Sequence, residues 1–285
     1  MVIKKVIVPA AGLGTRLLPV TKELPKEMLP IPFKGKNGRV CLKPLLQAIF
    51  EHLFDVGFRE FGFIVGRGKR AIEDHFTTDF GFVEYLKKRN KTSLAGELQE
   101  FYDKVNDSTI LFVNQPKPKG FGDAVYNARA FTQNEPFFVH AGDNFVISRG
   151  NLHLKRMIEI FEDRGADAVF LTEQVEDPRG YGVVVGKEVK PYVLRVTKVV
   201  EKPKKPPSNL AIIALYIFTP IIYEAIQKVK PDESGEIQLT DAIQLLLNWQ
   251  REIFALKLRP NERRIDIGVP DTYLKTVRGV LHRQS

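Results

Sequence analysis

The chain has 285 residues, of which 44% are hydrophobic and 27% charged, and it carries a net charge of +9 at pH 7. This composition provides for a packed core and excludes a disordered chain. The basic residues are spread along the sequence, which favours an anionic small substrate over nucleic acid. No apolar run reaches the length of a membrane span, the N-terminal residues lead into a strand rather than a signal peptide, and a lone cysteine, Cys41, permits no internal disulfide. We therefore expect a cytoplasmic protein with neither a nucleic-acid nor a membrane partner.

The first predicted element is a buried parallel strand, Val6-Ile7-Val8. It leads into small residues and glycines that would let backbone N–H groups approach a phosphate closely. These candidate nucleotide-binding residues are Ala10, Ala11, Gly12, Gly14 and Thr15. Arg16 and Lys26 add two cations, and the combination suits a polyphosphate. The stretch contains no P-loop, and Leu17 stands where a Rossmann fingerprint would place its last glycine.

Strands and helices then alternate along the chain. Apolar runs predict strands at 61–65, 109–113, 137–141 and 168–172, and helical patterns cover 43–53, 69–103 and 151–165. From residue 181 the pattern changes to the alternation of antiparallel strands, at 181–185 and 193–200, before another strand at 212–218. We predict an α/β fold with a Rossmann-like mixed, mainly parallel sheet flanked by helices, and a small antiparallel lobe between 173 and 207.

Two strand ends carry side chains suited to a nucleotide. Gln115 follows the third strand, where its amide can contact a pyrimidine edge while Gly120 offers backbone groups to the base. Asp143 follows the fourth strand, where ligands of open α/β sheets collect, and a carboxylate beside a polyphosphate is a hard oxygen ligand for Mg²⁺. Taken alone, Gln115 would more often cap a loop and Asp143 a turn. The phosphate-binding loop favours the functional interpretation of both.

The segment 12–16, followed by Lys26-Glu27-Met28-Leu29-Pro30, resembles the signature loop of the sugar-1-phosphate nucleotidylyltransferases. Within that family it is most similar to bacterial-type UTP–glucose-1-phosphate uridylyltransferases. Val-Glu-Lys-Pro at 200–203 and Gly-Glu-Ile-Gln-Leu-Thr-Asp at 235–241 are two further matches, and the resemblance extends from Val6 to about Pro270. It implies a Mg²⁺-dependent in-line displacement that joins UTP and glucose 1-phosphate into UDP-glucose and pyrophosphate.

The resemblance also implies roles for particular residues. Arg16 and Lys26 would hold the departing pyrophosphate, and Lys202 would position the attacking sugar phosphate, so these three are the predicted catalytic residues. Gly182 and Glu201 would join Lys202 in binding the sugar, because a carboxylate can accept hydrogen bonds from two vicinal hydroxyl groups. The nucleotide would lie on the loop described above and on Gln115 and Gly120.

The second metal ligand is also implied only by the resemblance. Asp266, in an Asp-Ile-Gly segment, would pair with Asp143 to hold Mg²⁺. We expect one domain over 1–285, with a nucleotide-binding part at 1–172, a sugar-binding part that includes the second metal ligand at 173–270, and a C-terminal helix at 271–285. The resemblance further implies a homodimer or homotetramer, for which aromatic residues at 69–103 would suit an interface.

The sequence departs from the uridylyltransferase pattern at two positions. Asp123 stands where those enzymes usually carry His. Asn144 follows Asp143, as it does in thymidylyltransferases, whereas uridylyltransferases usually carry an aliphatic residue after the Asp. A glucose-1-phosphate thymidylyltransferase, or an enzyme that accepts both UTP and dTTP, therefore stays open. The alternative that is not an enzyme is a catalytically silent nucleotide-sugar sensor. Relatives of that kind usually lose the lysines or metal-binding acids, and this chain keeps all four of them: Lys26, Asp143, Lys202 and Asp266. An NAD-dependent dehydrogenase is disfavoured by Leu17.

Overall fold

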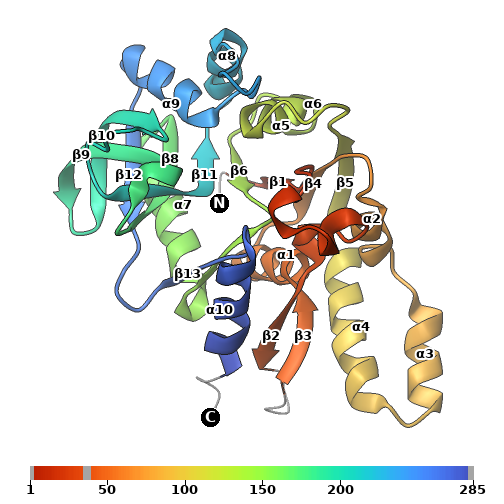
Figure 1. Ribbon diagram of the computed structural model, residues 1–285. Helices are drawn as coiled ribbons and strands as arrows, with labels where there is room; N and C mark the ends of the chain where they lie inside the picture. The colour runs from red at the N-terminus through yellow and green to blue at the C-terminus, as the bar shows by residue number, and fades with distance from the viewer. Residues whose placement is uncertain (1–2, 35–39, 282–285) are drawn as a thin grey trace.

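The computed structural model describes residues 3–34 and 40–281 (Figure 1). In these residues nine strands form one sheet in the order β5-β4-β1-β6-β11-β8-β12-β10-β9, and two pairs, β2-β3 and β7-β13, lie apart from it. The strands are β1 Lys5–Pro9, β2 Pro30–Lys34, β3 Val40–Pro44, β4 Glu60–Val65, β5 Thr109–Asn114, β6 Phe137–His140, β7 Asn144–Ile147, β8 Ala168–Gln174, β9 Gly182–Lys190, β10 Val193–Glu201, β11 Leu210–Phe218, β12 Ile253–Lys257 and β13 Arg263–Asp266.

Ten α-helices connect these strands in the described part of the chain. They are α1 Leu45–Val56, α2 Arg70–His75, α3 Phe80–Lys88, α4 Thr92–Asn106, α5 Phe121–Asn127, α6 Arg129–Thr132, α7 Leu152–Arg164, α8 Ile221–Lys228, α9 Leu239–Asn248 and α10 Pro270–Leu281. Short 3₁₀ turns interrupt the chain after β1, at Thr15–Leu17, Val20–Lys22 and Lys26–Met28. The predicted helical segment 69–103 is confirmed as α2, α3 and α4, of which α3 and α4 form a hairpin that projects from the body (Figure 1).

The sheet has a hydrophobic core on each face. Side chains alternate along β1, so Val6 and Val8 enter one core with residues of α1 and α7, while Ile7 enters the other with residues of α5, α8 and α9. Figure 1 shows α5, α6, α8 and α9 on one side of the sheet and α1 and α7 on the other. This three-layer arrangement confirms the predicted α/β fold with helices flanking a mixed sheet.

The parallel and antiparallel parts belong to one continuous sheet. β5, β4, β1 and β6 are parallel, β11 runs antiparallel to both β6 and β8, and β12 is parallel to β8. The predicted antiparallel lobe is the β9-β10 hairpin, which extends the edge of this sheet beyond β12. The predicted nucleotide-binding and sugar-binding parts therefore share one sheet.

Several elements differ from the prediction. The pair β2-β3 was not predicted, because Pro30 and Pro32 interrupt the pattern of β2, and Pro is tolerated only where a strand needs no N–H donor. Residues 33 and 34 belong to β2, and the glycine-containing stretch 35–39 lies outside the described residues. The C-terminal helix begins at Pro270, and the last four positions assigned to it, 282–285, lie outside the described residues.

Candidate active site

The loop after β1 forms one wall of a cavity of about 400 Å³. Gly14 has a left-handed backbone with φ of 68°, and the Thr21 hydroxyl donates to its carbonyl oxygen at 2.8 Å, so the turn needs a glycine and is fixed by a side chain. The predicted residues Ala11, Gly12, Gly14, Thr15 and Arg16 all line the cavity. Ala10 does not line it: its side chain is buried in the core between β1 and the helices.

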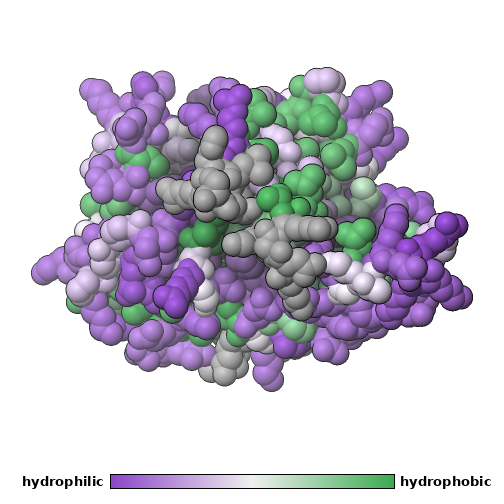
Figure 2. All heavy atoms as spheres, turned by 90° about the horizontal axis from the view of Figure 1, so that it is seen from below, coloured by the Kyte–Doolittle hydropathy of each residue, from purple (hydrophilic) through white to green (hydrophobic). Residues whose placement is uncertain are grey.

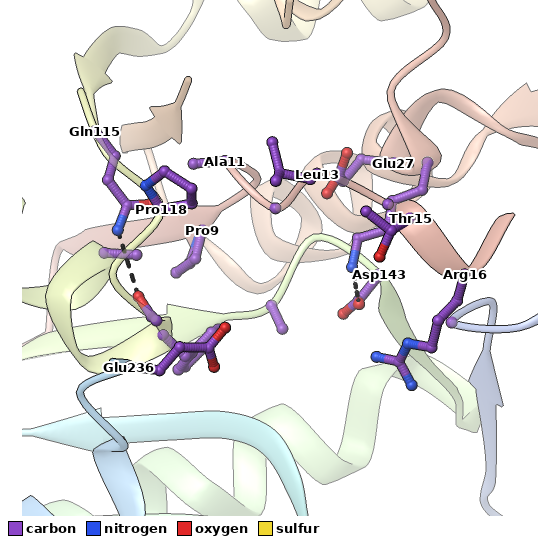
Figure 3. A pocket seen from close by; sticks show the side chains of 18 residues that line it. Pro9, Ala11, Leu13, Thr15, Arg16, Glu27, Gln115, Pro118, Asp143 and Glu236 are labelled. Atoms are coloured by element: carbon purple, nitrogen blue, oxygen red, sulfur yellow. Dashed lines mark hydrogen bonds and ion pairs between the residues drawn. The ribbon is translucent and has the colours of Figure 1, made fainter. Parts of the chain in front are cut away.

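Asp143 lies at one end of this cavity (Figure 3), and Lys26, which also lines the cavity, contacts it there. The Lys26 Nζ donates to Asp143 Oδ2 at 2.6 Å across 117 residues of sequence. Burial alone would raise the pKa of Asp143, but the Lys26 ammonium, with help from Asn144 and Arg264, holds it below its ordinary value. Burial alone would lower the pKa of Lys26, and the charges of Asp143 and Glu27 raise it instead. Both groups are therefore ionised at neutral pH, which supplies a fixed cation and a fixed anion at this end.

Gln115 and Pro118 lie at the other end of the cavity (Figure 3), and Gly120, which also lines the cavity, is in contact with Gln115. The Gln115 side chain is buried and its amide donates to the Gly120 carbonyl oxygen at 3.3 Å. Gly120 has φ of 95°, and a Cβ there would lie 2.9 Å from Glu236 and from the Ile237 backbone, so no other residue fits. The two residues predicted to contact a base are thus brought together, opposite the Lys26–Asp143 pair.

A smaller cavity of about 180 Å³ is lined by two of the three predicted sugar-binding residues. Gly182 and Glu201 line it, in register with each other at the start of β9 and the end of β10. A Cβ on Gly182 would lie 2.9 Å from the Thr240 hydroxyl and 3.2 Å from Glu201 Oε2. Lys202 differs from them: its side chain is 56% exposed and forms an ion pair with Glu201 Oε1 at 3.4 Å, outside the walls of the cavities described here.

Asp266 and Asp143 are neighbours through their strands. β13 and β7 pair so that Asp266 lies opposite Asn144, and the Ile267 amide donates to the Asp143 carbonyl oxygen at 3.4 Å. Their carboxylates have different partners, because Asp266 accepts from the Gly268 amide at 2.7 Å and from Arg264 at 2.5 Å. Among the described residues no group of three or more His, Cys, Asp or Glu side chains could hold a metal by itself. Asp143 lines the larger cavity beside the anion-binding loop, whereas Asp266 lines a separate cavity with Glu173 and Arg264. Mg²⁺ commonly takes one or two carboxylates from a protein and completes its ligands with water and phosphate, and Asp143 is placed for this.

Two charged residues that the sequence did not single out take part in this arrangement. The Arg264 side chain is 8% exposed and links β7 to β8, since it donates to Asn144 Oδ1 in β7 at 2.8 Å and lies 3.6 Å from Glu173 in β8. Glu27 is 1% exposed, lines the larger cavity and accepts from Lys69 at 2.8 Å. The available signal for Glu27 was its place directly after Lys26 and before the apolar Met28 and Leu29. Arg264 carried no signal beyond its place two residues before Asp266.

Fold and site together define an α/β protein with a cavity suited to a phosphorylated nucleotide at the carboxyl ends of parallel strands, and with a second, smaller polar cavity. The chain matches the Nucleotidyl transferase family over residues 5–283 and belongs to it. The UTP–glucose-1-phosphate uridylyltransferase of Pseudomonas aeruginosa is 35% identical over 277 residues, covering 96% of this chain and 94% of the relative. That of Staphylococcus epidermidis is 38% identical over 279 residues, covering 96% and 91%.

Solved structures agree with these relatives. A UDP-glucose pyrophosphorylase complexed with UDP-glucose is 33% identical, with a TM-score of 0.83 over 99% of both chains. The apo form of a UDP-glucose pyrophosphorylase reaches a TM-score of 0.88 at 32% identity, over 99% of this chain and 100% of the other. The predicted family is therefore confirmed. As for a membrane, no described helix is long and apolar enough to cross one.

Proposed function

We propose that this protein transfers a uridylyl group from UTP to glucose 1-phosphate, giving UDP-glucose and pyrophosphate. The carrying observation is the arrangement of one cavity, with the anion-binding loop and the Lys26–Asp143 pair at one end and the Gln115–Gly120 wall at the other. A nucleoside triphosphate matches this arrangement, because it has a base at one end and phosphates at the other. The relatives that match 96% of the chain are named for this reaction.

The reaction is a displacement at the α-phosphorus of UTP. An oxygen of the sugar phosphate forms the new bond, the bond to the bridging oxygen breaks, and pyrophosphate leaves with that oxygen. The attacking oxygen is an anion at neutral pH, so no general base is required. The work of the protein is to align two anions that repel each other and to neutralise their charge. Arg16 and Lys26, both in the wall of the cavity, are the cations for the departing pyrophosphate.

The sugar phosphate is held from the other part of the sheet. Glu201 lies in the smaller cavity, where its carboxylate can accept from sugar hydroxyl groups, and Gly182 keeps the space beside it open. Lys202 is exposed, and within the described residues its ammonium is paired only with Glu201, so it can move to a phosphate that arrives there. The shared sheet fixes the distance between the two cavities.

A magnesium ion is part of the proposal. Asp143 and Asp266 are the residues that would hold it, and the ion would supply positive charge to the phosphates. Lys26 donates to Asp143 and Arg264 donates to Asp266, so each carboxylate has a cationic partner that orients it.

The test is pyrophosphate release from purified protein with Mg²⁺ and glucose 1-phosphate, comparing UTP, dTTP, CTP, ATP and GTP. Release that is fastest with UTP supports the proposal. Comparable release with dTTP would establish a uridylyl and thymidylyl transferase of dual specificity. No release with any nucleotide from folded protein would refute the transferase proposal and favour a nucleotide-sugar sensor.

We further propose that the protein works in the cytoplasm as a homodimer or homotetramer. Large apolar side chains are exposed on α3 and β3, among them Phe82 at 48% and Leu42 at 66%. Figure 2 shows the molecule from below, with apolar side chains gathered near the middle of that face and hydrophilic ones around them. Size-exclusion chromatography with light scattering measures the mass in solution, and a mass of 32.4 kDa would contradict the oligomer.

A further inference from the structure

The orientation of the Gln115 amide is fixed by its surroundings. Its Nε2 donates to Asp123 Oδ2 at 2.7 Å and to the Gly120 carbonyl oxygen at 3.3 Å. A carboxylate and a carbonyl can only accept hydrogen bonds, so the amide nitrogen must face both of them. Exchanging the nitrogen and oxygen of the amide would place an oxygen against two oxygens in a wall where Gln115 is only 5% exposed.

Asp123 is itself held in place. The Asn127 side chain, one turn further along α5, donates to Asp123 Oδ2 at 3.1 Å and to the Asp123 carbonyl oxygen at 2.7 Å. Oδ2 therefore receives two N–H groups from two sides. The carboxylate that orients Gln115 is a fixed acceptor on a helix rather than a mobile surface charge.

Because its nitrogen faces Asp123 and Gly120, the Gln115 amide has only its oxygen, Oε1, left for a ligand in the cavity. Gln115 Oε1 has no hydrogen-bond partner among the described residues, and Gln115 lines the cavity. The Gly120 N–H, in the same wall, also bonds to nothing in the described part of the chain. A base that lies here meets an acceptor and a donor.

Uracil and cytosine differ at the atom that an acceptor would meet. Uracil carries a donor, N3–H, between two carbonyl oxygens, whereas cytosine has an unprotonated N3 in that position. With uracil, N3–H donates to Oε1 and a carbonyl accepts from Gly120. In the same position cytosine would place its N3 lone pair against Oε1, and two polar atoms would lose their partners. A flipped amide would reverse this preference.

We propose that Asp123 is a positioning residue that makes this site select uracil over cytosine, by holding the Gln115 amide with its oxygen towards the base. Thymine has the same N3–H, so Asp123 does not separate UTP from dTTP. The inference rests on the proposed nucleotide site. It adds a residue that acts only through Gln115.

The experiment compares kcat/KM for UTP and CTP, with glucose 1-phosphate, in the intact protein and in Asp123→Asn. An Asn side chain can donate as well as accept, so only the Gly120 carbonyl, at 3.3 Å, would still require the amide nitrogen of Gln115, and we expect the UTP/CTP ratio to fall at least tenfold. Asp123→Ala, which removes the acceptor altogether, should lower the ratio as well and serves if the Asn variant does not fold. Asp107→Asn is the matched control, because Asp107 is exposed and its side chain forms no bond within the described residues. An unchanged ratio in a folded Asp123 variant would overturn the proposal.

A double-mutant cycle separates positioning from a general structural effect. In Gln115→Met the amide is absent, so adding Asp123→Asn should leave the UTP/CTP ratio where Gln115→Met alone puts it. If Asp123→Asn lowers the ratio equally in both backgrounds, Asp123 acts by another route and the proposal is wrong.

Binding provides a readout that does not depend on turnover. Calorimetric titration with UDP-glucose and CDP-glucose should show the same loss of discrimination in Asp123→Asn. Selective binding of UDP-glucose without pyrophosphate release would refute the transferase function, and the role of Asp123 could still be tested by binding. Equal affinity of the unaltered protein for both ligands would refute the role of Asp123 alone.

Discussion

At the scale of single residues, the contact between Lys26 and Asp143 makes the sharpest prediction about catalysis. Each group is partly buried at the phosphate end of the cavity and each compensates the charge of the other. We expect Lys26→Met and Asp143→Asn each to lower kcat by roughly 10²- to 10³-fold, the range for removing one group that stabilises charge in a transition state. Pyrophosphate release at saturating UTP and glucose 1-phosphate measures it.

The matched control for Lys26→Met is Lys155→Met. Lys155 is exposed on α7 and forms no ion pair within the described residues, so its loss changes the net charge equally and should leave kcat within about twofold. Turnover that is unchanged in Lys26→Met, with normal folding, would remove Lys26 from the proposed mechanism.

Gly182 gives a prediction that separates the two substrates. A methyl group there would press against the Thr240 hydroxyl and Glu201 Oε2, both in the sugar cavity and neither in the nucleotide cavity. Gly182→Ala should therefore raise the KM for glucose 1-phosphate at least tenfold, while the affinity for UTP, measured by calorimetry, stays the same. Gly96→Ala in α4 has open space for its methyl group and serves as control. Equal loss of affinity for both substrates would place Gly182 outside a sugar-specific site.

At the scale of elements, the segment 232–238 holds the base-binding loop in place. The Ile237 amide donates to the Lys119 carbonyl oxygen at 2.8 Å, and the Gly122 amide donates to the Ile237 carbonyl oxygen at 2.9 Å. Asp232 orders the segment, because its carboxylate accepts from Ser234, Glu236 and Gln238.

We expect Asp232→Ala to loosen both loops together. Hydrogen exchange at the Ile237 and Gly122 amides should become faster, and the KM for UTP should rise severalfold, because Gly120 loses its support. Asp79→Ala is the comparison, since Asp79 accepts from the Phe82 amide at the start of α3, far from these loops in the chain. Protection of Ile237 that is the same in both variants would show that Asp232 does not order the segment.

The elements also show what could be predicted from sequence. β1 was predicted because Val6-Ile7-Val8 is a continuous apolar run, as expected for a strand covered on both faces. β12 was not predicted, although its first four residues are buried. Its neighbours are β8, about eighty residues earlier, and β10, and a local pattern does not contain pairing over such distances.

The candidate site was predictable to a similar degree. Residues that come directly after a strand, such as Gln115 and Asp143, could be placed at the edge of the sheet from the pattern alone. The direct bond between Lys26 and Asp143 could not, because it depends on how the 3₁₀ turns after β1 fold back over β6. The same holds for Asp123, whose role depends on the position of α5 relative to the end of β5.

At the scale of the whole molecule, the buried histidines make stability depend on pH. Burial lowers the pKa of His52, His75 and His140 to about 4 and that of His153 to about 3. In the unfolded chain these side chains take up a proton near pH 6.5. Between about pH 6.5 and 4 the unfolded state therefore binds more protons, so the free energy of unfolding falls as the pH is lowered.

The size of the effect follows from linkage, at roughly 1.4 kcal/mol for each pKa unit of each group. Glu27 acts in the opposite direction, because burial raises its pKa and the folded state gains stability on protonating it as the pH falls towards 4.5. Four histidines outweigh one carboxyl, and we expect a loss of several kcal/mol between pH 7 and 4 in urea unfolding. His153→Leu should lower the slope of the free energy of unfolding against pH by the equivalent of up to one bound proton. The reason is that the His153 ring is buried and its Nδ1 has no partner in the described residues. A curve that is flat from pH 7 to 5, or unaffected by this substitution, would show that the histidines titrate normally in the folded protein.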